Sequence, residues 1–196
     1  MTSRIRLMPS QHFEVRPVYT IDAFDRIVEV NRAFIDSLPN ASEKICESAL
    51  VGRPIWDFVP GFVPRQLWQV LYRRVRAIGA PMFVPLRADG PSHRSLIDVE
   101  LHPLADRSIR HVRERVSFES RAAVSLLDPN YPRDDRQIMR CAWCARIQIC
   151  LGRWEEVEEA HATLRLDQSM TLPQLQDSAC VDCKQSVLKT FPARVA

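Results

Sequence analysis

Two Cys-x-x-Cys pairs lie near the end of the chain, one formed by Cys141 and Cys144 and the other by Cys180 and Cys183. Each pair points two sulfurs at one metal ion, and two pairs supply the four thiolates of a tetrahedral zinc site with Zn–S distances of about 2.3 Å. Such a site is closed and has no position for a substrate. The pattern therefore predicts one structural zinc ion rather than zinc catalysis.

The same four thiolates leave two alternatives open. A thiol-based redox sensor would oxidise them and release zinc, and an iron–sulfur cluster also needs four cysteines. Cys46 and Cys150 stand alone, and we expect them to be buried apolar thiols. A disulfide framework is not expected, because six cysteines are sparse for that class and no secretion signal accompanies them.

The length and composition limit the class of protein. A chain of 196 residues with 46% hydrophobic residues can bury one good core, or one core plus a small satellite stabilised by a metal. No apolar run approaches the roughly 18–20 residues needed to cross a bilayer, and the N-terminus has no apolar region behind its arginines. We expect a cytoplasmic protein without membrane contact.

The charge distribution bears on nucleic-acid binding. The net charge is +3, and residues 141–196 carry 6 basic and 7 acidic groups. This near-neutral segment matches a phosphate backbone poorly, which disfavours a regulator that reads nucleic acid with its zinc module. The class stays open because Arg107, Arg110, Arg113 and Arg115 could form a basic patch.

The first 120 residues predict an α+β fold with an antiparallel sheet and helices packed on one face. Asn31 is placed to cap a helix that runs to Leu38, and Gly79 to end a longer amphipathic helix over 64–78. The predicted strands are 18–22, 26–30, 82–87, 94–104 and 108–118.

The second part is expected to be a separate module. Residues 126–136 are rich in Pro, Asp and Arg and hold too little apolar content for a core element, so the domain boundary is placed there. The 35 residues between the cysteine pairs exceed the usual ribbon spacing and leave room for a helix over 154–166 that would pack over the site. The predicted division is an N-terminal extension (1–16), a first domain (17–120), a linker (121–138) and a zinc-binding module (139–196).

Several segments resemble the PAS domain family of sensory modules. The matching segments are Arg26 to Phe34, Val51 to Phe58, the long helix and the three closing strands, over residues 17–120. The resemblance implies a five-stranded antiparallel sheet and a homodimer, for which the segment 1–16 is a candidate contact.

The tail is similar to a cysteine-rich tail found after bacterial PAS-type domains. That tail usually carries Thr-His-Gly-Ile before its second pair, whereas here Asp177, Ser178 and Ala179 precede Cys180. All four cysteines survive this departure, but the histidine is lost.

Two common cofactors would need specific residues in the PAS-like part. The long helix has no His to bind a haem, and the Asn-Cys-Arg-Phe-Leu-Gln motif of flavin photoreceptors is absent, so neither cofactor is expected. A small apolar or anionic ligand could lie between helix and sheet. The residues that could line such a pocket are Trp56, Phe58, Leu71, Phe83 and Leu96. The same residues are equally suited to an ordinary hydrophobic core, and we favour that interpretation.

No catalytic constellation is found. His93, His102 and His111 fall in predicted strands, where a histidine is expected to be a surface or hydrogen-bonded residue, and no nucleophile has an obvious base. A glycine-rich phosphate loop is also absent. The chain is therefore expected to be a non-enzymatic sensory or regulatory protein that signals through contacts with another signalling protein.

Overall fold

The computed structural model describes residues 16–38 and 46–189. The N-terminal contact predicted for the segment 1–16 falls almost wholly outside these residues. Among the helices of the described part, none has the length and apolar character that crossing a bilayer requires.

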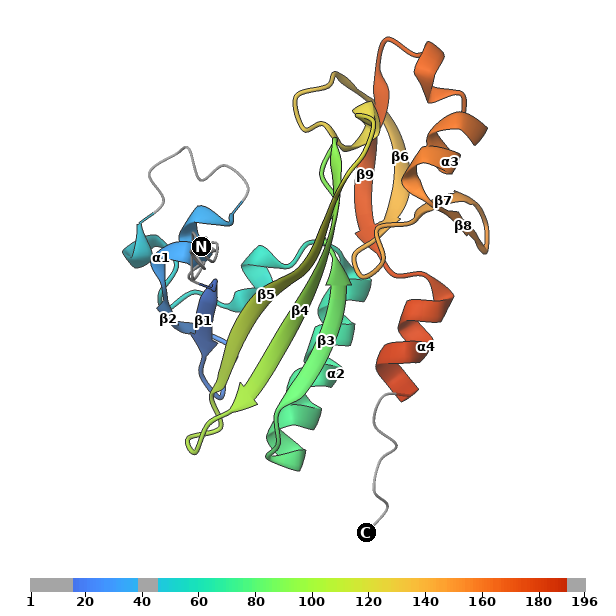
Figure 1. The fold of residues 1–196 in the computed structure, drawn as a ribbon. Helices are drawn as coiled ribbons and strands as arrows, with labels where there is room; N and C mark the ends of the chain where they lie inside the picture. The colour runs from blue at the N-terminus through green and yellow to red at the C-terminus, as the bar shows by residue number, and fades with distance from the viewer. Residues whose placement is uncertain (1–15, 39–45, 190–196) are drawn as a thin grey trace, which may run out of the picture.

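The first half of the chain folds into a five-stranded sheet in the order β2-β1-β5-β4-β3 (Figure 1). Every neighbouring pair is antiparallel, which confirms the predicted fold class. β3 has the predicted bounds, and the others agree within a few residues. The strands are β1 (Val18–Ile21), β2 (Ile27–Val30), β3 (Met82–Arg87), β4 (His93–Pro103) and β5 (Ile109–Ser120).

Helices cover one face of this sheet. α1 (Arg32–Asp36) begins at Asn31, whose side chain accepts a hydrogen bond from the backbone N–H of Phe34, as predicted. Two 3₁₀ turns, Glu47–Ala49 and Ile55–Phe58, precede the long helix.

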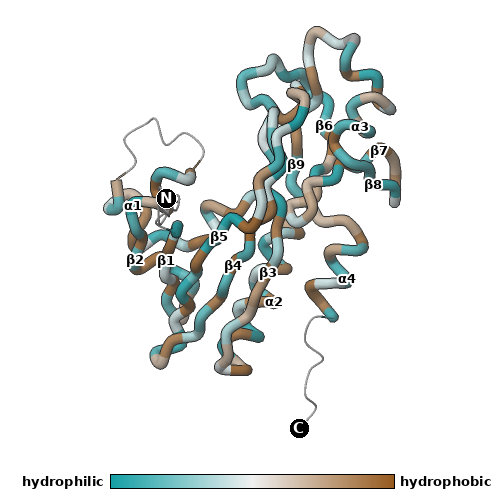
Figure 2. Tube along the Cα trace, viewed as in Figure 1, coloured by the Kyte–Doolittle hydropathy of each residue, from teal (hydrophilic) through white to brown (hydrophobic). Residues whose placement is uncertain are grey.

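That helix, α2 (Phe62–Ile78), lies against the sheet and ends at Gly79. Gly79 has a φ of +68°, the left-handed conformation that glycine adopts without strain. Leu71 and Val75 of α2 are buried against Val99 and Leu101 of β4 in the core, and apolar residues recur along these elements (Figure 2).

The second half forms a four-stranded sheet in the order β8-β7-β6-β9, with β6 and β9 parallel. Its strands and helices are β6 (Arg133–Cys141), β7 (Ile147–Cys150), β8 (Arg153–Glu155), α3 (Val157–Thr163), β9 (Leu172–Ser178) and α4 (Val181–Lys189).

Two expectations for this half are wrong. The segment 126–136 was predicted to hold no core element, but it contains the first residues of β6. Leu126 and Leu127 are buried in the hydrophobic cluster of the C-terminal half. The helix predicted over 154–166 begins at Val157, because Trp154 belongs to β8. Val124, Leu126 and Leu127 are buried in a cluster with residues that follow them in the chain, such as Ile147 and Leu172, and local composition does not reveal this.

The two halves share one core. Cys141, Trp143 and Val187 of the second half are buried in the same hydrophobic cluster as the five-stranded sheet and α2. A second cluster, which includes Ile147 and Leu172, lies wholly in the C-terminal half.

Ion pairs reinforce the junction between the halves. Arg87 at the end of β3 pairs with Glu156, which precedes α3, and with Asp89. Arg121, after β5, pairs with Glu158 of α3. These guanidinium groups are largely shielded from solvent, so their pairing is more than a surface contact.

Candidate metal centre

The four cysteines of the two pairs come together in a single cluster. Their sulfur atoms all lie within 4.8 Å of one another, and the Sγ atoms of Cys144 and Cys180 are 3.8 Å apart. The predicted site residues Cys141, Cys144, Cys180 and Cys183 are therefore grouped as a metal-binding set of four requires.

Each pair sits where a strand gives way to a turn. Cys141 is the last residue of β6, and the backbone N–H of Ala145 donates to its carbonyl oxygen, which closes the first turn. Cys180 follows β9, and Cys183 lies in the first turn of α4.

Parallel pairing of β6 with β9 brings the two turns together. Arg140 pairs with Asp177 and Cys141 with Ser178, so both turns leave the same end of neighbouring strands. The Arg140 guanidinium also forms an ion pair with Asp177, and the backbone N–H of Ala142 donates to the Ser178 carbonyl.

Backbone amides point at the sulfurs. The N–H of Cys180 donates to Cys141 Sγ at 3.4 Å, and the N–H of Cys183 donates to Cys180 Sγ at 3.4 Å. Such bonds stabilise thiolate over thiol and orient the sulfur toward a shared centre.

The thiols are strongly coupled among themselves. Hydrogen bonds from Cys144 and Cys183 hold the pKa of Cys141 far below its usual range. The same contact with Cys141 raises the pKa of Cys144 to about 12 and, together with Cys144, raises the pKa of Cys183 still further. Cys141, Cys144 and Cys183 therefore do not titrate independently of one another, as expected of sulfur atoms that share one small centre.

One guanidinium lies close to the sulfurs. The pKa of Arg146 is raised by its hydrogen bond to Glu156 and, further, by its proximity to the sulfur atoms of Cys144 and Cys180. A divalent metal with four thiolates leaves a net charge of −2, which a neighbouring cation partly offsets.

The cysteines differ in exposure. Cys141 and Cys180 are buried, whereas Cys144 and Cys183 are half-buried and line a cavity beside the cluster. Cys46 and Cys150 are exposed, so the prediction that both are buried thiols is wrong. Cys150 ends β7 at a tight turn to β8, where its side chain meets solvent instead of the core.

The predicted ligand-pocket residues are only partly brought together. Leu71, Phe83 and Leu96 line the cavity beside the cluster. Trp56 packs on Tyr72, and Phe58 lies under Arg53, both away from it. The expectation that these residues are core holds for Leu71, and Trp56 and Phe58 are partly buried against the core. It is wrong for Phe83 and Leu96, which are 60% and 36% exposed.

Trp143 is the site residue that sequence reasoning missed. It lies between the first two cysteines, and its ring stacks on Trp68 of α2 at a centroid distance of 5.7 Å. Its carbonyl oxygen accepts a hydrogen bond from the backbone N–H of Arg87 in β3. The sequence did carry a signal for this role, because Trp143 is a large apolar residue inside a metal-binding turn. A large apolar side chain at such a position indicates packing onto a neighbouring domain.

The strand histidines are not alike. His93 stacks on Phe118, and His102 contacts Glu100. His111, however, is fully buried against Tyr19, and neither ring nitrogen has a hydrogen-bond partner among the described residues. The expectation of a surface or hydrogen-bonded side chain is therefore wrong for His111.

The candidate basic patch is partly engaged in ring contacts. The Arg113 guanidinium lies over the rings of Tyr19 and Phe34, and that of Arg115 over Phe118. These arginines are held against the sheet by aromatic side chains.

Comparison with known proteins gives matches in solved structures alone: no family model matches the chain, and no curated protein does. The PAS domain of BvgS from Bordetella pertussis is similar over 52% of this chain and 72% of its own, with a TM-score of 0.36 and 18% identity. A sensory box sensor histidine kinase from Vibrio cholerae covers 52% of this chain and 82% of its own, with a TM-score of 0.37 and 12% identity.

The PAS domain of an HTR-like protein from Haloarcula marismortui matches over 53% of this chain and 84% of its own, with a TM-score of 0.34 and 17% identity. At these identities no ligand or activity of the three proteins transfers to this chain. The five-stranded antiparallel sheet with helices on one face is the architecture that the sequence resemblance to PAS domains implies.

Proposed function

We propose that this chain is a non-catalytic sensory or regulatory protein in which a structural zinc ion, held by four cysteines, fastens a C-terminal module to a PAS-like domain. The observation that carries the proposal is the position of the cluster: Cys141 and Cys180 belong to the same core as the five-stranded sheet. The metal would then stabilise the sheet as well as the module, because binding free energy at such a site is folding free energy.

Zinc is the metal that the donor set favours. Four sulfur ligands suit a closed tetrahedral Zn²⁺ site, and among the described residues the cluster consists of cysteines alone. An iron–sulfur cluster also takes four cysteines but would colour the protein.

The proposal has three further parts. The protein passes its signal on through contacts with another protein, it forms a homodimer, and it is located in the cytoplasm. Exposed, unpaired thiols at Cys46 and Cys150 support a reducing compartment, since oxidising compartments favour their pairing. Contact with another signalling protein is proposed over catalysis because the sequence carries no recognised catalytic motif.

Elemental analysis and a visible spectrum of the purified full chain test the zinc site. We expect about one zinc per chain and no colour, loss of metal in Cys180→Ser, and full metal content in the matched control Cys150→Ser. Iron with visible absorption, or equal zinc content in Cys180→Ser, would contradict the proposal.

A second candidate, a thiol switch at the same site, is favoured by the unequal burial of the cysteines. Cys144 and Cys183 are reachable through the cavity, whereas their two partners are not. In the switch, two thiolates give two electrons to a peroxide and form a disulfide, the peroxide is reduced to water with two protons, and zinc is released. A chromogenic chelator would report zinc release on peroxide addition in a Cys46→Ser, Cys150→Ser background, and retention of zinc would exclude the switch.

A further inference from the structure

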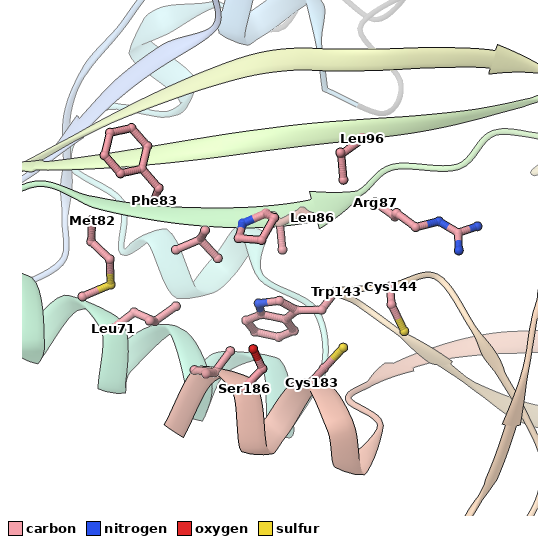
Figure 3. Close-up of a pocket in the computed structure, with 13 residues that line it drawn as sticks. Leu71, Met82, Phe83, Leu86, Arg87, Leu96, Trp143, Cys144, Cys183 and Ser186 are labelled. Carbon is pink, nitrogen blue, oxygen red and sulfur yellow. The ribbon is translucent and has the colours of Figure 1, made fainter. Parts of the chain in front are cut away.

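An apolar cavity of about 420 Å³ opens where the C-terminal module meets the edge of the five-stranded sheet (Figure 3). Its size falls in the range of small-molecule sites, roughly 300–1,000 Å³. One wall is the edge strand β3 with Leu96 of β4, another is Leu71 of α2, and the third comes from the metal module. Trp143, Cys144, Cys183, Ser186 and Val187 form this third wall.

The cavity is distinct from the interior between α2 and the sheet. That interior is filled by Tyr72 and Val75 of α2 and by Leu101 of β4, which are almost completely buried. The cavity instead exists only because the metal module is docked against the sheet edge. Figure 3 shows the Trp143 ring between β3 and α4, with Cys144 and Cys183 beside it.

The lining offers no free positive charge. Arg87 is its one cationic residue and is already paired with Asp89 and Glu156, while Cys144 and Cys183 belong to the metal cluster, whose net negative charge repels an anion. An anionic occupant would therefore lose its hydration without gaining a counter-ion. This favours a neutral occupant.

One hydrogen-bond donor in the wall is unsatisfied. The indole nitrogen of Trp143 is buried and has no acceptor among the described residues, and Figure 3 places it on the ring edge that faces β3. Buried N–H groups almost always have a partner, and an acceptor on an occupant would supply one.

The edge strand itself is closed to an added peptide strand. Pro85 has no N–H to offer, and the N–H of Arg87 already donates to the Trp143 carbonyl. An added strand would find too few partners on β3, so the occupant is a small molecule rather than a peptide.

We propose that this cavity binds a neutral small molecule with an apolar body and one hydrogen-bond acceptor, which Trp143 Nε1 recognises. The proposal rests on the sensory function proposed above and names the class of signal molecule. An occupant touches β3, α2 and α4 at once and covers Cys144 and Cys183. Its binding therefore tightens the docking of the metal module on the sheet.

The test uses 6-propionyl-2-(dimethylamino)naphthalene, a neutral fluorophore with an apolar body and one carbonyl acceptor. With the zinc-loaded full chain we expect saturable binding of one probe and a blue-shifted emission. Ser186→Trp, which places an indole in the cavity, should weaken binding about tenfold or more, whereas Gln185→Trp, on the exposed neighbouring position of α4, should leave it unchanged. Trp143→Phe removes the indole N–H together with part of the ring and should weaken binding about three- to tenfold.

Absence of saturable binding, or equal affinity of wild type and Ser186→Trp, overturns the proposal. If Ser186→Trp does not retain its fold by circular dichroism, Leu96→Trp fills the cavity from the opposite wall. Metal content is measured on the same samples. A metal-free preparation that still binds the probe contradicts the zinc site and supports the cavity, whereas zinc-loaded protein without saturable binding overturns the cavity alone.

Discussion

At the scale of single residues, His111 is a fully buried titratable group. Burial, followed by the positive charges of Arg113 and Arg76, holds its pKa well below the ordinary value of 6.5. The imidazole is thus neutral in the folded protein, with its ring stacked on Tyr19 at 4.2 Å.

This burial predicts a loss of stability in acid. Below pH of about 6.5 the unfolded chain binds a proton at His111 that the folded chain does not, so the free energy of unfolding falls as the pH falls, by up to about 1.4 kcal/mol per pH unit. Above that pH, His111 does not make the free energy of unfolding depend on pH. Urea unfolding from pH 5 to 7.5 measures the effect.

The matched variant is His111→Phe, which keeps a ring against Tyr19 but cannot take a proton. Protonation of the cysteine ligands affects both proteins alike, so the difference between them isolates His111. Parallel pH profiles for the two would contradict the prediction.

Gly61 is a residue at which the backbones of the two halves approach closely. It precedes α2 with a φ of +82°, and a Cβ there would lie 2.3 Å from the carbonyl oxygen of Asp177 in β9. Gly61→Ala should therefore lower the free energy of unfolding by about 2–4 kcal/mol, through backbone strain and the clash together.

Gly52→Ala separates these two causes. Gly52 has a φ of +87° but open space around the added Cβ, so its substitution should cost about 1 kcal/mol from backbone strain alone. Equal losses in the two variants, measured by urea unfolding, would show that the contact with Asp177 carries no weight.

At the scale of elements, α4 is held to α2 by one guanidinium. Arg74 donates to the carbonyl oxygens of Val187 and Leu188, 2.7 and 2.9 Å away, which are among the last carbonyls of α4 and have no partner within the helix. The positive charge also suits the negative end of the helix.

Removing this contact should loosen α4. Arg74→Ala is expected to lower the local opening free energy of residues 181–189 by about 1–2 kcal/mol, visible as faster amide hydrogen exchange there. Arg73→Ala, at the exposed neighbouring position, is the control and should leave exchange unchanged. Unaltered exchange in Arg74→Ala would contradict the role of Arg74.

The elements of the first half could be predicted because their signals are local. Asn31 and Gly79 mark the ends of helices through their own side chain and backbone conformation. In β3 and β4, the residues that alternate in the sequence also lie on alternate faces of the sheet. The four cysteines were likewise predictable from spacing alone.

Long-range pairing decided what could not be predicted. The burial of Leu126 depends on strands that follow it in the chain, and Phe83 is exposed because it lies on the opposite face of β3 from the buried Met82 and Val84. The role of Trp143 needed its contact with Trp68, which lies 75 positions earlier in the sequence.

At the scale of the whole molecule, the two halves share one hydrophobic core, although the sequence predicted a linker between them at residues 121–138. Trp143 and Val187 pack into the core of the five-stranded sheet. A chain that ends after Ser120 would expose the surface they cover.

We therefore expect such a truncated chain to be less stable than the full, zinc-loaded chain by about 3–5 kcal/mol, the cost of uncovering several large apolar side chains. Chemical denaturation followed by tryptophan fluorescence and by circular dichroism measures it. Equal stability of the first domain in the two chains would show instead that the halves fold independently.

The parallel pairing of β6 and β9 has a consequence for how chains of this kind can diverge. Strand alignment, and not the length of the intervening chain, determines where the cysteine pairs meet. The connection between α3 and β9 lies at the far end of these strands and is free to accept insertions, whereas one residue added within β6 would turn Cys141 toward the opposite face. Cysteine spacing can thus drift widely in sequence while the metal geometry stays fixed.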